Sequence, residues 1–255
     1  MHKRILDMRE IWLSAAGLCG STLLGSAIGF FFKGMSHKWQ DTVMGYCAGV
    51  MLAASVLGLL VPAMEFADGG RWWMILAGVC CGVLFLNLMD VVTPHLHSLT
   101  GVDPEEHGHN RNLDKTLLIV LAIAMHKLPE GMAAGVGFNM EDTADAWSVV
   151  LGISIQNIPE AMIVIAPLLV AGVSRLRAGI AALVISLLEI AGVWLGYALG
   201  AISQMVLPLM LAFVGGLMLY VVSDEMIPET HSHGYHKYAT YALMLGFLTI
   251  ALASC

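Results

Sequence analysis

The sequence predicts an all-α integral membrane protein, a bundle of about eight transmembrane helices in which the fourth and fifth are kinked at proline. The first observation is composition: of 255 residues, 58% are hydrophobic and only 12% are charged, and the mean hydropathy is +0.79. A soluble domain is usually about 45–50% apolar and about 25% charged. The second observation is a series of apolar runs, and the third is a pair of proline-containing polar motifs inside two of them.

Each apolar run has close to the roughly 20 residues that a spanning helix needs. The runs cover residues 11–32, 42–64, 72–92, 115–139, 146–170, 178–200, 204–227 and 238–254. The first is too long for the apolar region of a signal peptide, about 7–15 residues, so it is expected to be an uncleaved helix. Because most connections are short, residues 1–255 are expected to form one transmembrane domain, with 93–114 as a histidine-containing loop within it.

Small residues recur every four positions on the first run, at Gly17, Ser21, Gly25 and Gly29. This spacing lets helices approach closely in lipid, and packing is its expected role. The cysteines all lie in apolar runs and are expected to be buried thiols rather than a disulfide framework. They are Cys19, Cys47, Cys80, Cys81 and Cys255.

The charged residues indicate both partners and orientation. The net charge of −7 gives no support for a nucleic-acid partner. With an even number of spans the two termini share one side, whose basic residues are Lys3, Arg4, Arg9 and Arg71. The opposite side has Lys33, Lys38, Arg111, Lys115, Arg175, Arg177 and Lys237. Since basic residues are enriched in cytoplasmic loops, both termini are expected outside the cell membrane and the 93–114 loop inside.

Two polar motifs lie near the middle of the fourth and fifth runs, HKLPEG at 126–131 and QNIPEA at 156–161. His126 and Glu130 are four residues apart and share one helix face, and Gln156 and Glu160 have the same relation. Polar side chains inside a span are costly and usually functional. If the two faces meet, an imidazole, an amide and two carboxylates converge, a set that suits zinc and similar divalent ions.

The prolines of these motifs add to the prediction. Pro129 cannot donate to the carbonyl of Met125, and Pro159 cannot donate to that of Ile155. Each is expected to leave a kink and a free carbonyl at membrane depth, as in the broken helices of transporter binding sites. Two kinks beside two acidic motifs favour a functional site over kinks made only for packing.

Charges inside the spans leave two interpretations open. Two nearby carboxylates in a low dielectric need a cation, which could be a divalent ion, a shared proton or Lys127. A buried Lys–Glu pair that only joins helices is the alternative. Glu189, in the sixth run, is a candidate metal ligand or a partner of Lys127.

Further candidates lie near the expected cytoplasmic side. Asp224 and Glu225, at the end of the seventh run, are candidates for an exit path, or they simply face water. Short histidine-rich tracts suggest weak metal capture, with a solvated polar loop as the alternative. The histidines in question are His95, His97, His107, His109, His231 and His233.

At these residues the sequence resembles the ZIP (Zrt-, Irt-like protein) family of metal transporters, in its bacterial GufA-like branch. The resemblance covers nearly the whole chain. Its further features are SDEMIPETH at 223–231, the run AGVMLAASVLGLLVPAMEFA at 48–67 and the loop before the fourth run. It implies eight spans with both termini outside, a bacterial inner membrane, and transport of zinc or related ions such as Cd²⁺, Fe²⁺ or Mn²⁺ into the cytoplasm, often by a homodimer.

Carried over, the resemblance implies a transport site between the fourth and fifth helices with His126, Glu130, Gln156 and Glu160 as metal ligands. Many members have Asn at the position of Lys127. In those members this Asn, together with the residues at the positions of Asn157, Glu160 and Glu189, helps to hold a second metal. A protonated lysine has no lone pair with which it could bind a metal ion. We therefore expect one central metal, with Lys127 paired to Glu160 or Glu189. Gln156 stands where other members have His, which weakens one ligand.

The expected function is divalent metal transport by alternating access, with the ion as substrate and no resident cofactor. Two other classes stay open: a proton-coupled carrier of an organic substrate, using Glu130, Glu160 and Lys127 as a relay, and a membrane metal sensor that binds through the loop histidines. An intramembrane zinc protease would need an H-E-x-x-H motif. The chain has none, and no enzymatic activity is expected.

Overall fold

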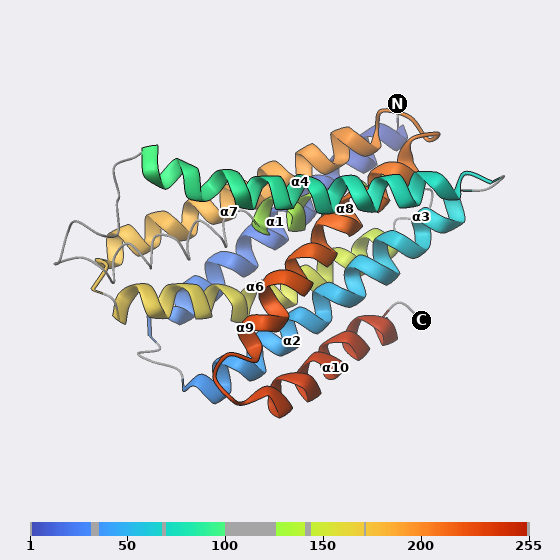
Figure 1. Ribbon diagram of the computed structural model, residues 1–255. Coiled ribbons are helices and arrows are strands. Elements are labelled where there is room, and N and C mark those ends of the chain that lie inside the picture. Colours follow the sequence, from blue (N-terminus) through green and yellow to red (C-terminus); the bar gives the residue numbers. More distant parts are fainter. Residues whose placement is uncertain are drawn as a thin grey trace.

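The chain folds into a bundle of helices that lie lengthwise against one another (Figure 1). The computed structural model describes residues 2–31, 36–67, 70–99, 126–140, 144–170 and 172–253, and it has no strand within them. The elements are α1 (His2–Gly29), α2 (His37–Ser55), η1 (Val56–Leu60), α3 (Val61–Phe66), α4 (Trp72–Leu99), α6 (Ala144–Val170), α7 (Arg175–Gly200), α8 (Leu207–Val221), η2 (Val222–Met226), α9 (Ile227–Thr230) and α10 (His236–Ala253). Residues 126–137 form a further helix, called here the 126–137 helix. The all-α prediction is confirmed.

Six of the described helices are long and apolar enough to cross a membrane. They are Met8–Gly29, His37–Phe66, Trp72–Met89, Ala146–Val170, Arg175–Gly200 and Leu207–His231, and they match six of the expected runs. The fourth expected run is described only from residue 126, and α10 covers the eighth but begins with the polar pair His236 and Lys237. The multi-pass architecture therefore agrees with the sequence, while the number of eight spans stays a prediction.

Helix α4 is longer than the apolar run that predicted it. It continues to Leu99, so His95 and His97 lie in helix rather than in a loop. The polar residues after 92 limit the apolar stretch but not the helix, because backbone hydrogen bonds continue past the last apolar side chain. The rest of the expected loop, with His107 and His109, lies outside the described residues.

Two short π-helical segments interrupt the long helices. Segment η1 joins α2 to α3 just before Pro62, and η2 joins α8 to α9 just before Pro228. A proline has no N–H to donate, and a wider π turn lets the helix continue past it. The sequence prediction considered Pro129 and Pro159 instead. Pro159 lies inside α6, and the kinks at both stay predictions.

The helices pack as two groups. In the first, which we call the α1 group, α1 packs on α6 and α7, and the 126–137 helix packs on α7. In the second, the α2 group, α2 with η1 and α3 packs on α10 and on α8 with η2 and α9, and α8 packs on α4. Helices α2 and α6 touch across the two groups.

Glycine allows the closest approaches within the α1 group. A Cβ on Gly25 would lie 2.2 Å from the carbonyl oxygen of Ile158 in α6, which confirms that the small-residue face of the first helix packs closely. A Cβ on Gly131 would lie 2.1 Å from the carbonyl oxygen of Glu189, and one on Gly192 would lie 2.4 Å from that of Leu128. The 126–137 helix and α7 therefore cross backbone to backbone.

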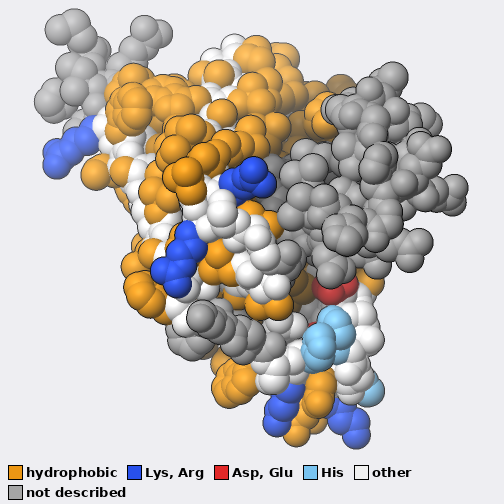
Figure 2. Space-filling model, turned by 90° about the vertical axis from the view of Figure 1, so that its left-hand side faces the viewer, with side chains coloured by type: hydrophobic (Ala, Val, Ile, Leu, Met, Phe, Trp, Pro, Cys, Tyr) orange, Lys and Arg blue, Asp and Glu red, His pale blue; other side chains and the backbone are white. Residues whose placement is uncertain are grey.

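Both termini lie at the same end of the bundle, on the right in Figure 1. The opposite end, which faces the viewer in Figure 2, presents basic side chains together with histidine. Lys38, Arg175 and Lys237 lie there, near the starts of α2, α7 and α10. The shared side of the termini agrees with the sequence prediction, and the assignment of the basic end to the cytoplasm stays a prediction.

The cysteines divide between core and surface. Cys47 in α2 is buried and Cys19 in α1 is half-buried. Cys80 and Cys81 in α4 are exposed, so the expectation of buried thiols is wrong for these two. The reason is that α4 lies on the outside of the bundle, where many of its apolar side chains point away from the protein.

Candidate functional site

A lysine lies at the centre of the polar cluster that the two motifs form. The side chain of Lys127 is 1% exposed, and its Nζ donates to Glu130 Oε2, to Asn157 Oδ1 at 2.7 Å and to Glu160 Oε2 at 2.8 Å. An ammonium has three donors, so all of them are used. The predicted pairing of Lys127 with Glu160 is confirmed.

Glu130 and Glu160 use only part of their hydrogen-bonding capacity on Lys127. Glu130 and Glu160 each give one oxygen, Oε2, to Lys127. Both residues also line a cavity. One ammonium balances one carboxylate, so the pair retains a negative charge next to the cavity whenever both are ionised. That arrangement attracts a cation from the cavity.

A chain of hydrogen bonds extends the cluster to α7 and α1. Asn157 accepts from Lys127 and donates through Nδ2 to Glu189 Oε1 at 2.6 Å. Thr22 donates through Oγ1 to the other oxygen, Glu189 Oε2, at 2.8 Å. Glu189 is fully buried and reaches Lys127 through Asn157. The sequence prediction missed Thr22, although a threonine within a span is itself a signal for an interhelical hydrogen bond.

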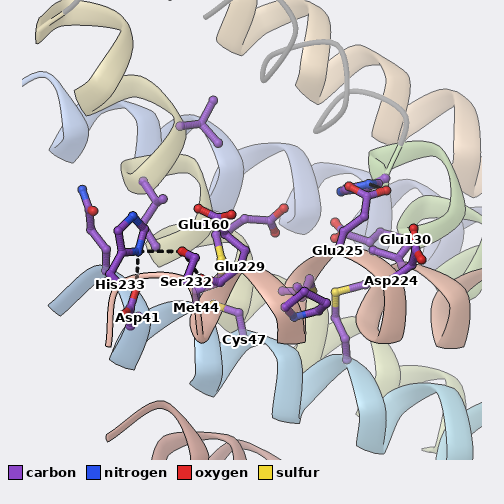
Figure 3. Close-up of a pocket in the computed structure, with 18 residues that line it drawn as sticks. Asp41, Met44, Cys47, Glu130, Glu160, Asp224, Glu225, Glu229, Ser232 and His233 are labelled. Atoms are coloured by element: carbon purple, nitrogen blue, oxygen red, sulfur yellow. Dashed lines mark hydrogen bonds and ion pairs between the residues drawn. The ribbon is translucent and has the colours of Figure 1, made fainter. Parts of the chain in front are cut away.

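His126 is held by a residue of the other helix group. Its Nε2 lies 2.8 Å from Glu225 Oε1, and Glu225 comes from η2. The π turn brings Glu225 and the neighbouring Asp224 to the cavity, at the same end as Glu130 (Figure 3). The two candidates for an exit path therefore lie beside the central cluster rather than only at the end of the span.

A cavity of about 760 Å³ leads to this cluster. Figure 3 shows Glu130 and Glu225 toward one end of it, and Asp41 and His233 toward the other. Asp41 lies near the start of α2 and His233 between α9 and α10, so the mouth is at the end of the bundle away from the termini. The walls come from both helix groups, with His126 and Glu160 on one side and α2 and η2 on the other.

Gln156 lies behind Glu130. It is fully buried, and its Nε2 donates to Glu130 Oε1 at 3.4 Å. Its Oε1 has no hydrogen-bond partner among the residues that the structure describes. A buried amide oxygen without a partner is costly, and a cation is one group that could satisfy it.

The predicted ligands are gathered but do not yet form a metal site. His126, Glu130 and Glu160 share the cavity wall and Gln156 touches Glu130. Within the described ranges, no three side chains of His, Cys, Asp or Glu are placed to hold one ion. The physical reason is competition, because Lys127 draws both carboxylates to itself and Glu225 holds His126.

Sulfur atoms line the α2 side of the cavity. Met44, Cys47 and Met51 are spaced by three and four residues, so they share one helix face, and all three line the cavity. Cys47 Sγ donates to the carbonyl oxygen of Gln156 at 3.7 Å. The spacing of sulfur residues within the second span was the sequence signal for this face.

The two histidines that follow α9 differ in whether they line the cavity. His233 lines the cavity mouth. His231 does not line it; its Nδ1 lies 2.8 Å from the carbonyl oxygen of Ile227 and 2.9 Å from Thr230 Oγ1. The structure therefore places one of these two histidines, and not the other, in the wall of the cavity.

Comparisons with known proteins identify the family of this chain. A family model described as "ZIP Zinc transporter" matches residues 103–254. Among named relatives, zinc transporter GufA of Myxococcus xanthus is 38% identical over 245 residues, which is 91% of this chain and 95% of the relative. Zinc transporter ZIPB of Bordetella bronchiseptica is 35% identical over 91% of this chain and 76% of its own length. Human zinc transporter ZIP11 is 30% identical over 91% of this chain and 92% of its own length.

Proposed function

We propose that this chain, which belongs to the ZIP zinc transporter family, carries divalent metal ions across a membrane into the cytoplasm, with zinc as the main substrate. It is a multi-pass membrane protein. The ion is a transported substrate rather than a cofactor of an enzyme. Cadmium, iron and manganese are the other candidates, because the same nitrogen and oxygen ligands bind them.

The cluster around Lys127 is the observation that supports this proposal most. It places Glu130 and Glu160 at the foot of a cavity, with a buried carboxylate, Glu189, behind them. Burying several carboxylates around one ammonium is costly unless a further cation or proton compensates them. A structural tie between helices would need only one carboxylate for Lys127. The excess acid beside a cavity is what a cation carrier requires.

One ion would bind at the inner end of the cavity, between the 126–137 helix and α6. Glu130 and Glu160 would supply oxygens, and Gln156 would supply its unpartnered Oε1. His126 would supply Nε2 after it leaves Glu225. We infer one central ion rather than two, since the ammonium of Lys127 already occupies the space among Glu130, Asn157 and Glu160.

Movement of the two helix groups against each other would give alternating access. The cavity lies between the α1 group and the α2 group, and its mouth is at the end away from the termini. With both termini outside the cell membrane, this arrangement would be open to the cytoplasm. Asp224, Glu225 and His233 would then receive the ion on its way out.

The outer surface of the bundle supports lipid as its surroundings. Helix α4 exposes Trp72, Leu76, Leu84 and Leu88, among other apolar residues. Such a face is stable only against lipid or another apolar surface. We propose lipid contact around the bundle and a homodimer as the assembly, in a bacterial inner membrane.

Zinc entry into sealed proteoliposomes with a trapped fluorescent zinc reporter tests the proposal. The native chain is compared with the double variant His126→Ala, Glu130→Ala and with a control, His236→Ala, at an exposed position off the cavity. We expect entry with the native chain and the control, and loss of entry with the double variant. A native chain that is folded but moves none of zinc, cadmium, iron or manganese would contradict the proposal. It would favour the organic-carrier or sensor interpretation.

A further inference from the structure

A second cluster of ligand-type side chains lies at the mouth of the cavity, apart from the cluster around Lys127. His37 is the first residue of α2, and Asp41 follows one turn later on the same helix. His233 lies in the turn between α9 and α10, 192 positions from Asp41 in the sequence. Asp41 and His233 both line the cavity (Figure 3).

Asp41 has a carboxylate oxygen that lacks a partner. The residue is only 2% exposed. Its Oδ1 lies 3.0 Å from His233 Nδ1, but its Oδ2 has no hydrogen-bond partner in the part of the chain that the structure describes. Burying a carboxylate oxygen in this state is unfavourable, and a cation that enters from the cavity would relieve it.

Lys38, on the same helix as Asp41, contacts an aromatic ring rather than this carboxylate. Lys38, three residues before Asp41, places its Nζ 4.0 Å from the centre of the Tyr238 ring. The ion pair that the described structure gives to Asp41 is with His233 alone. Of the two oxygens of this carboxylate, Oδ2 is therefore the one that can accept a metal ion from the cavity.

The fold brings a second imidazole to the same place. The rings of His37 and His233 stack with their centres 4.3 Å apart and their planes at 17°. Gly234, with φ of +85°, directly follows His233 and turns the chain back toward α10. Only glycine adopts this left-handed conformation at no cost. The turn leaves His233 beside the first turn of α2. Side chains that are far apart in the sequence of the α2 group therefore meet.

We infer that Asp41 and His233 form a second divalent-metal site, at the cavity mouth, that takes zinc or a similar ion with waters completing its coordination. A carboxylate and an imidazole are the ligands that such ions prefer. No three ligand side chains within the described residues converge on one point. The site therefore has two protein ligands, with the His37 ring stacked against the His233 ring. A site with few protein ligands exchanges its ion quickly, which suits a passage rather than a store.

Ion binding at the cavity mouth is independent of whether the protein transports the ion. Binding of an ion at the mouth follows from the Asp41 and His233 geometry alone. The assignment of this site to the path of a transported ion rests on the proposed function. The mouth site would then hold the ion after it leaves the central cluster and before it enters bulk water.

Equilibrium dialysis of the purified full chain against zinc alone tests the inference. The variants are Asp41→Asn, which keeps the shape of the side chain, and His233→Gln, with His236→Gln as the control at an exposed histidine of the same region. A further variant, His126→Ala, removes one ligand of the central site without changing Lys127. Thermal unfolding of each variant checks that it is folded.

We expect the native chain to bind a second zinc ion more weakly than the first. Asp41→Asn and His233→Gln should each lower the affinity for this second ion on the order of tenfold or more. The His236→Gln control should keep both ions, and His126→Ala should keep the weaker one. Unchanged zinc binding in folded Asp41→Asn and His233→Gln would overturn the inference, and a loss of thermal stability alone would show the pair to be only structural. Absence of transport by the native chain, with the mouth ion present, would contradict the proposed function but not this inference.

Discussion

The ammonium of Lys127 lies 2.8 Å from Glu160 Oε2, across the interface between the 126–137 helix and α6. Both side chains come from the same kind of motif, a polar pair followed by Pro-Glu, and the two motifs are thirty positions apart. The helices are therefore joined at the site itself. This ion pair decides how many further cations the site can take.

Replacing Lys127 by Asn should raise the zinc bound to the purified chain by up to one ion, which is added at the central cluster. The substitution removes a positive charge and adds an amide oxygen among Glu130, Asn157 and Glu160, where oxygen ligands favour a second ion. The metal content of the purified protein measures the effect. Lys127→Arg keeps the charge and serves as the control. No increase in Lys127→Asn over the native chain would contradict the argument that lysine occupies a cation position.

Replacing Glu225 by Gln should tighten zinc binding at the central cluster. The native carboxylate holds His126 Nε2 at 2.8 Å, so zinc must break that interaction to gain its ligand. Hydrogen bonds to charged groups contribute roughly 1.5–3 kcal/mol, so we expect the Kd to fall by roughly tenfold to a hundredfold. Competition with a chelating zinc indicator measures it. The control is Asp224→Asn, which changes a neighbouring carboxylate on the same wall; an equal effect of both variants would argue against a specific role for Glu225.

Adding a methyl group at Gly131 should destabilise the bundle. Its Cβ would lie 2.1 Å from the carbonyl oxygen of Glu189, so the 126–137 helix and α7 would have to move apart. Overpacking of this kind costs about 1–3 kcal/mol of unfolding free energy. Gly20→Ala is the matched control, because no atom of another described segment lies within 4 Å of a Cβ there. Thermal unfolding in detergent should show a lower midpoint for Gly131→Ala only, and equal midpoints would mean that the crossing is looser than described.

Replacing Thr22 by Val should weaken the link between α1 and Glu189. The change keeps the shape of the side chain but removes the hydroxyl that donates to Glu189 Oε2 at 2.8 Å. A buried carboxylate oxygen that loses its donor costs about 1–3 kcal/mol of stability. Thr240→Val is the control, since Thr240 Oγ1 donates only within its own helix, to the carbonyl of His236. If both variants unfold at the same temperature, the Thr22 hydrogen bond contributes nothing measurable.

Much of the site could be predicted from the sequence because the motifs are local. A spacing of four residues puts His126 and Glu130 on one helix face whatever the rest of the fold does. The same holds for Gln156 and Glu160. Such costly side chains within apolar runs are predicted to be functional. The structure shows that Lys127 joins the two motifs, and the role of these residues in binding metal stays a prediction.

The sequence alone determined the all-helical membrane architecture, most helix positions and the identity of the central cluster, because hydrophobic length and helical spacing are properties of one segment at a time. The tertiary structure decided which distant side chains meet. It brought Glu225 to His126, Thr22 to Glu189 and His233 to Asp41. Those contacts depend on the π turn before Pro228, on backbone crossings at glycine and on the left-handed turn at Gly234. Such features set the relative position of helices, and a pattern within a single helix carries no information about that position.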